Sequence, residues 1–381
     1  MTTNLRINRI FSTLESLEDM AGNQAVSLHS QIRCHRLWTT LTCLLCVCGL
    51  LFVTLLTVFA APAQQTTDPV FVGAGDIADC RSPHDTETAN LLDAIPGAVY
   101  TLGDNVYERG TLADFTNCYE PSWGRHKART YPAVGNHDYV TSGASGYYTY
   151  FGAVASPLEP NCTANCKGYY SYDLGAWHII VLNSQSAANA GSAQEQWLRA
   201  DLAAHPTACT LAYWHIPRFS SGSTLTDNKY LAFWQALYAA GADVVLNGHE
   251  HFYERFALQN PNGQADAAHG IRQFIVGTGG RDLQGFGTIH RNSEIRNNKA
   301  WGVLKLTLHA TSYDWAFVPV AGQSFADTGS ANCVAAAGPA ATPLPTATST
   351  PAPPPLPTRT VEPPVPATPV QRLFFPIIQH F

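Results

Sequence analysis

The segment VFVGAGDIADC, residues 70–80, joins an apolar, β-branched run to a glycine-rich turn that carries a carboxylate. From Gly73 onward it also fits G-x-G-x-x-A, a pattern typical of dinucleotide-binding turns. Such a turn presents bare backbone N–H groups to a pyrophosphate at the start of a helix. Asp76 would bring negative charge to that point, and helical spacing begins only after Pro83. We therefore interpret the segment as a strand end that delivers a carboxylate to a metal.

Similar apolar runs recur along the chain and predict strands buried on both faces: AVYTLGD (98–104), HIIVLNS (178–184), CTLAYWH (209–215) and DVVLNGH (243–249). Helical spacing lies between them, at 86–95, 192–204 and 229–241. Ser192 with Glu195 forms a capping-box start and Gly241 a C-terminal stop. Later runs at 272–278, 302–309 and 313–320 lack helices between them, which predicts antiparallel strands of a second sheet. The whole pattern predicts one α/β domain over 68–336, built as a two-sheet sandwich.

Polar side chains of a limited set follow the buried strands. In chain order they are Asp76, Asp104 with Tyr107, Asn136 with His137, His215, and His249 with His251. Ligands bind at the carboxyl ends of strands in α/β sheets, so we expect these side chains to gather at one edge. His249 and His251 are two residues apart on an extended segment and therefore point the same way. Oxygen and imidazole donors without thiolate suit Zn, Fe or Mn, so the sequence predicts a metal site.

Taken together, these endings resemble the motifs of a known family. D-x-A (76–78), GDNVY (103–107), GNHD (135–138), His215 and GHEH (248–251) are similar to the motifs of calcineurin-like metallophosphoesterases. The tyrosine that ends the second motif resembles the purple acid phosphatase branch. The resemblance extends over most of 68–320 and implies a four-layer α/β/β/α sandwich of two mixed sheets, the metallophosphoesterase fold.

The resemblance also implies a role for each matched side chain. Asp76, Tyr107 and His251 would hold a first metal, Asp104 would bridge to a second, and Asn136, His215 and His249 would complete the second. The implied ions are Fe(III) at the first position and Zn(II), Mn(II) or Fe(II) at the second. A hydroxide held by the metals would attack a phosphate ester in line. His137 would contact the substrate, and either stabilise the transition state or protonate the leaving oxygen.

Two positions depart from the pattern of that branch. Ala78 stands where glycine is common, and its methyl group is expected to do little harm unless the backbone there needs a positive φ. Ile216 stands where relatives often carry a second, substrate-contacting histidine, so the acid role falls more heavily on His137. Arg218 has two open interpretations, a phosphate ligand or a solvated loop arginine.

The N-terminal segment, residues 1–63, carries a targeting signal. Its uncharged run at 37–61 follows Arg33 and Arg36 and is long enough to span a bilayer. The sequence Ala-Pro-Ala at 61–63 favours signal cleavage, whereas the long stretch before the run favours an uncleaved anchor, and both remain open. In either case the domain is expected to be secreted or extracytoplasmic, with membrane contact only through this segment.

The C-terminal end differs in composition from the domain. Residues 338–369 form a Pro/Thr-rich linker of the extended kind. Residues 370–381 are apolar but too short to span a membrane. We interpret them as a sorting or cell-surface attachment tail; an apolar terminus without such a role is the alternative that stays open.

Cysteine usage and charge restrict the class of protein further. Six cysteines follow the leader, an even number that predicts disulfides in an exported chain. Six cysteines allow 15 pairings, so the connectivity stays open. Cys162–Cys166 is the first pair expected because it closes a small loop, and Cys80–Cys118 with Cys209–Cys333 is the pairing that we expect for the other four. The net charge is −6 and no long basic run occurs, so nucleic-acid binding is not expected.

The predicted function is an exported dinuclear-metal phosphohydrolase acting on phosphate esters. One alternative is a surface binding module that kept the fold and lost most activity; the intact set of ligand residues argues against it. A Ser-His-Asp hydrolase is disfavoured because the sequence contains no G-x-S-x-G. Monoesterase, phosphodiesterase and nucleotidase activities remain open, as does the oligomeric state.

Overall fold

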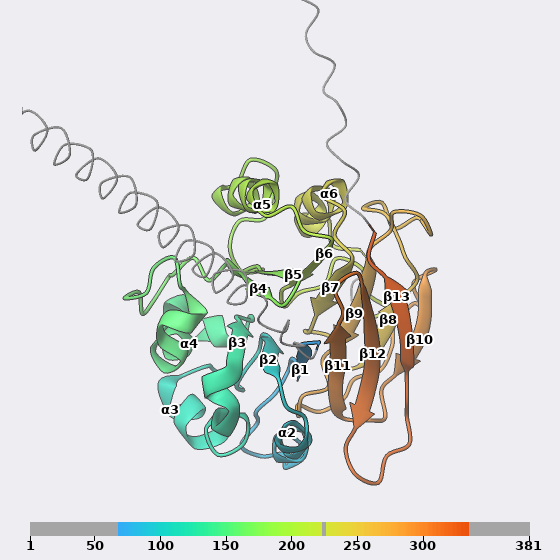
Figure 1. Ribbon diagram of the computed structural model, residues 1–381. Helices are drawn as coiled ribbons and strands as arrows, with labels where there is room; N and C mark the ends of the chain where they lie inside the picture. The colour runs from blue at the N-terminus through green and yellow to red at the C-terminus, as the bar shows by residue number, and fades with distance from the viewer. Residues whose placement is uncertain (1–67, 223–225, 335–381) are drawn as a thin grey trace, which may run out of the picture. The chain divides into compact units, whose positions relative to one another are not determined.

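The computed structural model describes residues 68–222 and 226–334, in which two mixed β-sheets lie between layers of helix (Figure 1). The predicted leader (1–63), linker (338–369) and tail (370–381) fall outside these residues. Among the helices that the structure describes, none is long and apolar enough to cross a membrane.

The first sheet has six strands and contains the segment that opens the domain. Its order is β13 (Thr328–Asn332), β12 (Ser312–Pro319), β11 (Gly302–Leu308), β1 (Val70–Ala74), β2 (Ala98–Leu102) and β3 (Thr130–Ala133). β1, β2 and β3 run parallel to one another. On the other side of β1, β11 pairs antiparallel with β1, β12 with β11, and β13 with β12. The parallel half therefore brings three consecutive strand ends to the same edge.

The second sheet has seven strands. Its order is β10 (Ser293–Asn297), β8 (Tyr253–Phe256), β9 (Arg272–Val276), β7 (Val244–Asn247), β6 (Cys209–Tyr213), β5 (Trp177–Val181) and β4 (Tyr170–Leu174). β5, β6, β7 and β9 are parallel neighbours, and β4, β8 and β10 add antiparallel edges. β5, β6 and β7 are rich in β-branched and aromatic residues, which favour extended backbone.

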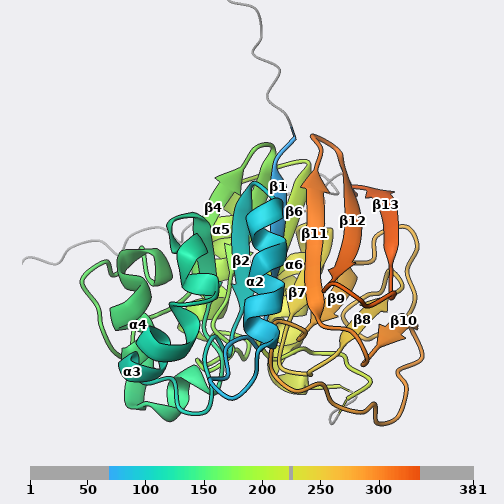
Figure 2. The ribbon, with the colours of Figure 1, turned by 90° about the horizontal axis from the view of Figure 1, so that it is seen from below.

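Helices cover the outer faces of both sheets. α5 (Ala193–Ala204) and α6 (Leu231–Ala239) lie side by side over the seven-stranded sheet, and α2 (His84–Ala94) lies on the far side of the six-stranded sheet (Figure 1). The turned view shows α2 running along β1 and β2 (Figure 2). The shorter helices α3 (Leu112–Asp114) and α4 (Ser145–Phe151) lie beyond β3. This arrangement confirms the predicted α/β/β/α layering.

Two apolar clusters hold the layers together. On β6, Leu211 and Tyr213 belong to the cluster shared by the two sheets, whereas Ala212 and Trp214 belong to the cluster under α5 and α6. This alternation follows from the two-residue period of a strand. It explains why the strand reads as a continuous apolar run, since both of its faces are buried.

The helix boundaries follow from local chemistry. The Ser192 side chain accepts a hydrogen bond from the Glu195 backbone, as predicted, but the Glu195 carboxylate accepts from Gly191 rather than from Ser192. Gly241, at φ +75°, follows α6 in the left-handed conformation that ends helices.

The predicted division of strands between the sheets is wrong, because the three later runs do not form a sheet of their own. The run 272–278 contains β9, which pairs parallel with β7 in the seven-stranded sheet, not with the antiparallel strands β11 and β12. The crossover between β7 and β9 is not a helix but the antiparallel strand β8 with its loops, so the absence of a helical pattern was misleading. β11 and β12 are antiparallel as predicted, but they extend the sheet that begins with β1.

All three predicted disulfides are formed, Cys80–Cys118, Cys162–Cys166 and Cys209–Cys333. They differ in the length of chain that they close. Cys209–Cys333 ties the start of β6 to the residue after β13 across a separation of 124 residues, whereas Cys162–Cys166 closes a separation of 4. A longer closed loop removes more entropy from the unfolded chain.

We predict that replacing Cys209 and Cys333 together by alanine lowers the free energy of unfolding by about 5 kcal/mol, whereas replacing Cys162 and Cys166 lowers it by about 2 kcal/mol. Urea titration of both double variants under non-reducing conditions measures the difference. Equal losses would contradict the loop-entropy explanation.

Candidate metal centre

The polar residues predicted from strand ends lie where the two sheets meet at their carboxyl edges. Main-chain hydrogen bonds join the sheets there: the Gly75 amide donates to the Val276 carbonyl at 2.8 Å, and the Gly279 amide donates to the Gly75 carbonyl at 2.9 Å. The His215 ring reaches across and donates from Nδ1 to the Leu102 carbonyl at 2.7 Å. Side chains from both sheets therefore face one buried space.

Four side chains form the first half of the site. The Tyr107 hydroxyl donates to Asp76 Oδ1 at 2.8 Å and lies 3.2 Å from Asp104 Oδ2. It also lies 3.1 Å from His251 Nε2, which is 3.4 Å from Asp76 Oδ1. All four residues are buried. Two carboxylates, a phenol and an imidazole thus place their donor atoms within contact distance of one another.

The second half shares Asp104 with the first. Asp104 Oδ2 lies 3.1 Å from His215 Nε2, which lies 3.0 Å from Asn136 Oδ1. His249 Nδ1 lies 3.2 Å from the same nitrogen of His215. Asp104, His215 and His249 offer ligand atoms within 4.8 Å of one another, as a common metal ion requires. Asp104 Oδ2 therefore stands between the two groups of donors.

Unusual backbone conformations aim these side chains inward. Asp76, Asp104 and His249 have φ values of 60°, 47° and 72°, in the left-handed region that residues other than glycine rarely adopt. Strain of this kind persists only where the surroundings hold it, and it gathers at functional sites. The positive φ predicted as a risk at Ala78 falls instead on Asp76. Ala78 itself is buried and bridges Val106, so the methyl group is accommodated.

Backbone amides fix the orientation of both carboxylates. The His249 amide donates to Asp76 Oδ2 at 2.8 Å, and the His137 amide donates to Asp104 Oδ1 at 2.7 Å. Each carboxylate thus uses one oxygen to hold a neighbouring motif and turns the other toward the centre. These two hydrogen bonds tie the GHEH motif to the D-x-A motif and the GNHD motif to the GDNVY motif.

Two of the histidines are oriented by carbonyl groups. His215 donates from Nδ1 to Leu102, and His251 donates from Nδ1 to the Asp282 carbonyl at 2.9 Å. Both rings therefore direct Nε2 at the carboxylates. Metal-binding histidines are held in this way by a hydrogen bond from the other ring nitrogen.

The donors perturb one another's pKa values. Burial alone would raise the pKa of Asp76, but the hydrogen bond and charge of His251 outweigh it and lower the pKa to about 2. Burial would lower the pKa of His215, but the Asp104 charge raises it to about 9. Burial, followed by the His215 charge, lowers the pKa of His249 to about 4. Burial and both carboxylates raise the pKa of the Tyr107 phenol well above its usual value.

The donor set fits a pair of hard or borderline cations. It consists of carboxylate, phenol, amide and imidazole groups, and no thiol takes part. The Tyr107 hydroxyl hydrogen bonds to Asp76, and His215 Nε2 faces Asp104, so hydrogens occupy the positions between donor atoms that metal ions would take. Metal binding in proteins releases such protons. Two cations would also offset the two buried carboxylates, which is how buried charges are tolerated.

His137 lies beside these donors at the edge of the site. It is half-buried, its ring centre is 4.5 Å from that of Tyr107, and Nδ1 lies 2.8 Å from the Glu108 carbonyl, which accepts its hydrogen. This bond leaves Nε2 as the ring nitrogen available to a substrate.

Asp138 and Asn105 hold the loops of the centre together, and neither was predicted from the sequence as a site residue. Buried Asp138 accepts from the Gly135 amide at 2.8 Å and from the Asn105 side chain at 2.9 Å. It therefore ties the second motif to the third. Both residues lie inside the quoted motifs GDNVY and GNHD, so adjacency to predicted ligands was the available signal.

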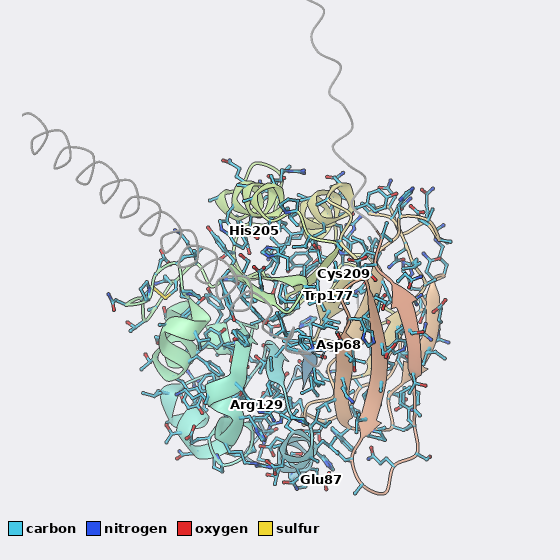
Figure 3. The ribbon with its side chains drawn as sticks, viewed as in Figure 1. Asp68, Glu87, Arg129, Trp177, His205 and Cys209 are labelled. Carbon is cyan, nitrogen blue, oxygen red and sulfur yellow. A yellow bond between two sulfur atoms is a disulfide. The ribbon has the colours of Figure 1, made fainter. Side chains whose placement is uncertain are left out.

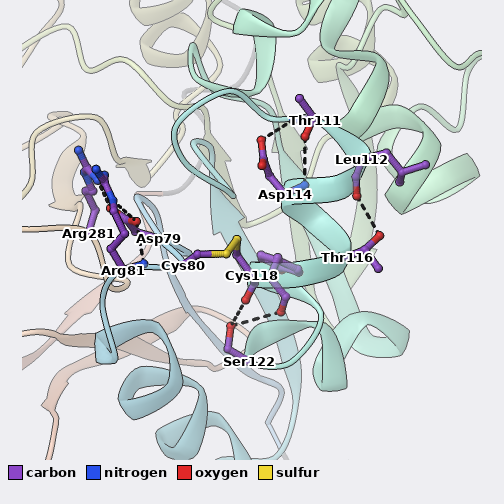
Figure 4. Close-up of a disulfide and its surroundings, with 11 residues drawn as sticks. Asp79, Cys80, Arg81, Thr111, Leu112, Asp114, Thr116, Cys118, Ser122 and Arg281 are labelled. Carbon is purple, nitrogen blue, oxygen red and sulfur yellow. Dashed lines mark hydrogen bonds and ion pairs between the residues drawn. A yellow bond between two sulfur atoms is a disulfide. The ribbon is translucent and has the colours of Figure 1, made fainter.

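Arg281 was also missed. Its guanidinium lies 4.7 Å from the centre of the Tyr107 ring and pairs with Asp79 and with Glu108, the latter at 2.9 Å. Its amide donates to the Asp76 carbonyl at 2.9 Å. The Asp79 contact lies beside the Cys80–Cys118 disulfide, which anchors this loop (Figure 4). A cation over an aromatic face is attracted by the ring, so Arg281 helps to hold the tyrosine in place.

Arg218 fits neither interpretation given above. It is buried, and its guanidinium donates to the Pro261 carbonyl at 3.0 Å and to the Asp227 carbonyl at 2.9 Å. These contacts hold Arg218 to the surrounding loops, so it is not free to bind a phosphate.

Tyr147, Tyr148 and Tyr150 lie on α4 and are buried among aromatic neighbours.

The fold and the strand-end donors define a metallophosphoesterase-type protein. The family model for calcineurin-like phosphoesterases matches residues 51–253, more than half of the chain. The chain therefore belongs to the calcineurin-like phosphoesterase family.

Relatives within this family are purple acid phosphatases. Purple acid phosphatase 15 of Arabidopsis thaliana is 28% identical over 212 residues, which are 48% of this chain and 40% of the relative. Purple acid phosphatase 18 of the same plant is 32% identical over 123 residues, which are 31% of this chain and 28% of the relative. The chain thus spans less than half the length of these relatives.

Solved structures of the same fold support the architecture. A purple acid phosphatase from yellow lupin (Lupinus luteus) seeds matches with a TM-score of 0.54 at 17% identity, covering 70% of this chain and 54% of that one. GAP50, the anchor in the inner membrane complex of Plasmodium, matches with a TM-score of 0.54 at 14% identity, covering 70% and 90%. At these identities the likeness is one of fold.

The packing around Asp104 gives a test of the geometry. A Cβ on Gly135 would lie 2.1 Å from the Asp104 amide nitrogen and 2.2 Å from its Oδ1. We predict that Gly135→Ala lowers the free energy of unfolding by about 1–3 kcal/mol, because backbone and carboxylate must move. Gly285→Ala is the control, since a Cβ there meets nothing within 4 Å. Urea titration of both variants measures the effect, and a Gly135 variant as stable as the control would contradict this packing.

Proposed function

We propose that this chain is an exported phosphohydrolase that cleaves phosphate esters at a centre of two metal ions. The observation that carries the proposal is the shared carboxylate: Asp104 Oδ2 contacts both the Tyr107 hydroxyl and His215 Nε2. Each of these belongs to a separate group of donors. A carboxylate in that position is suited to bridge two cations.

The ligand set that we propose follows the two groups. Asp76, Tyr107 and His251 hold one ion with Asp104, and Asn136, His215 and His249 hold the other with Asp104. The phenol suits Fe(III), and the amide and imidazoles suit Zn(II), Mn(II) or Fe(II). Arg281 over the Tyr107 ring adds positive charge next to the phenol that must lose its proton.

Metal ions bound there would polarise the phosphoryl group and supply a water acidic enough to attack phosphorus near neutral pH. The protein contributes orientation. The His249 and His137 amides hold the carboxylates, and the Leu102 and Asp282 carbonyls hold two of the imidazoles. Groups that are fixed before the substrate arrives need little reorganisation during the reaction.

His137 is the proposed catalytic residue at the substrate side. Its Nδ1 bond to Glu108 keeps the ring oriented and leaves Nε2 to contact the phosphate or the leaving oxygen. Ile216 offers no titratable group, so His137 carries this role without a second histidine at that position.

Export is supported by the cysteines. Three disulfides form among the described residues, and disulfides persist in oxidising compartments outside the cytoplasm. The leader in residues 1–63 is proposed to direct the domain there, either as a cleaved signal or as an anchor. Cell-surface attachment through residues 370–381 belongs to the same proposal.

We predict that Asp104→Asn lowers hydrolysis of a chromogenic phosphate monoester and diester at least ~100-fold, and that it lowers the metal content. The amide keeps the shape of the side chain but removes the bridging charge. Activity, bound iron, zinc and manganese, and the visible tyrosinate absorption of the purified full chain measure the effect.

Asp314→Asn is the matched control, because Asp314 is exposed on β12 and contacts only the His309 ring in the structure described here. It should keep full activity. A wild-type protein that is active after exhaustive chelation, or an Asp104 variant that keeps wild-type activity, would overturn the proposed function.

For His137→Ala we predict a fall in kcat of about 10²–10⁴-fold with unchanged metal content, because the side chain assists the reaction without holding an ion. Steady-state kinetics and metal analysis on the same preparation separate the two effects. Loss of metal in this variant would instead make His137 a structural part of the centre.

A further inference from the structure

A second cluster of metal-ligating side chains lies at the other end of the seven-stranded sheet. His178, Asp201 and His205 offer ligand atoms within 4.8 Å of one another, as Asp104, His215 and His249 do in the strand-end centre. His178 pairs in register with Thr210 on β6, and His215 lies five residues after Thr210, just past the end of that strand. At about 3.3 Å per residue, this puts roughly 16 Å between the clusters.

We propose that His178, Asp201 and His205 form a separate site for a divalent cation of the zinc class. The proposal does not depend on the function proposed above, because none of these residues contacts the strand-end donors.

The fold brings the three side chains together from a helix end and a strand. Asp201 and His205 are four residues apart at the end of α5, so they lie on one face of the helix. His178 lies on β5, on the face that α5 covers, and is buried. His205 is the residue that follows the last turn, on the outer side of the domain (Figure 3).

Distances show that the donor atoms converge on Asp201. His178 Nε2 lies 2.9 Å from Asp201 Oδ2, and His205 Nδ1 lies 3.5 Å from Asp201 Oδ1. The two imidazoles stack with ring centres 4.5 Å apart and planes inclined by 13°. Ser171 donates to Asp201 Oδ1 at 2.7 Å and so holds the carboxylate from the other side.

A second carboxylate orients the buried histidine. Asp173, directly opposite His178 in the β4–β5 ladder, lies 2.9 Å from its Nδ1. A hydrogen bond from Nδ1 to a carboxylate fixes the ring and directs Nε2 at the ligand position, as in carboxylate–histidine–zinc arrangements. Here Nε2 points at Asp201 Oδ2.

The site is reachable from solvent. The His205 side chain is 44% exposed, and that of Asp173 is 64% exposed. In the structure described here His205 Nδ1 donates to the Asp201 carbonyl at 2.9 Å, a bond at the surface that the ring can exchange for a metal ion. Two imidazoles and one carboxylate are a common zinc set, and water completes such three-residue sites.

A proton competes with the metal for this position. Burial alone would lower the pKa of His178, but hydrogen bonds to Asp201 and Asp173 outweigh it and raise the pKa above its usual value. The groups facing the ring are Asp201 and His205 from α5 and Asp173 from β4. Zinc at Nε2 would take the place of the hydrogen that His178 shares with Asp201.

The test compares wild type with His205→Ala, using the full chain stripped by a chelator and reloaded with zinc chloride at pH 7.5. We expect the variant to bind one zinc ion per chain fewer than wild type, measured by mass spectrometry of the metal after gel filtration. His205 is at the surface, so its loss leaves the fold intact. His269→Ala is the matched control, because that exposed side chain belongs to neither cluster.

A second variant, Asp201→Asn, should lose the same single ion, and zinc should raise the thermal midpoint of wild type more than that of either variant. Equal zinc stoichiometry and equal zinc-dependent stabilisation in wild type and His205→Ala would overturn the site and leave His178 as a hydrogen-bonded link between two carboxylates. An Asp104 variant lowers the metal content independently, so failure at one site is distinguishable from failure at the other.

Discussion

One buried carboxylate connects the two halves of the candidate centre. Asp104 lies directly after β2, at φ 47°, and its two oxygens have separate tasks. Oδ1 accepts a hydrogen bond from the His137 amide, and Oδ2 contacts the Tyr107 hydroxyl on one side and His215 Nε2 on the other. Gly135 must lack a side chain for this residue to fit. The two-metal interpretation depends on this single position, because among the described residues it is the Asp104 carboxylate that contacts side-chain donor atoms of both groups.

The arrangement of sheets makes that position available. Parallel strands deliver Asp76, Asp104 and Asn136 from one sheet, while His215 and His249 come from the other, and face-to-face packing brings both sets together. Buried carboxylates and imidazoles are costly to hold apart from water unless they are paired. The described site pairs them through backbone amides and carbonyls, which orient the side chains without adding further charge.

The strand-end residues could be predicted from sequence because a buried strand has a clear apolar pattern and its end is marked by glycine. All seven predicted ligands lie in the connected group of contacts around Asp104. Sheet membership was harder: β9 joined the sheet of β7 because strand pairing depends on contacts distant in sequence, which periodicity does not encode. Arg281 and Asp138 were missed for the same reason, since their partners lie on other segments. The edge strands β4, β10 and β13, and β8 beside β10, carry mixed polar patterns that give weak signals.

Anomalous X-ray diffraction at the iron and zinc absorption edges, on crystals of protein purified without chelators, tests the central claim most directly. We expect two scattering centres that flank the Asp104 carboxylate, one in contact with Tyr107 and the other with His215. A single ion that does not touch Asp104, or no anomalous signal between these side chains in metal-replete crystals, would contradict it.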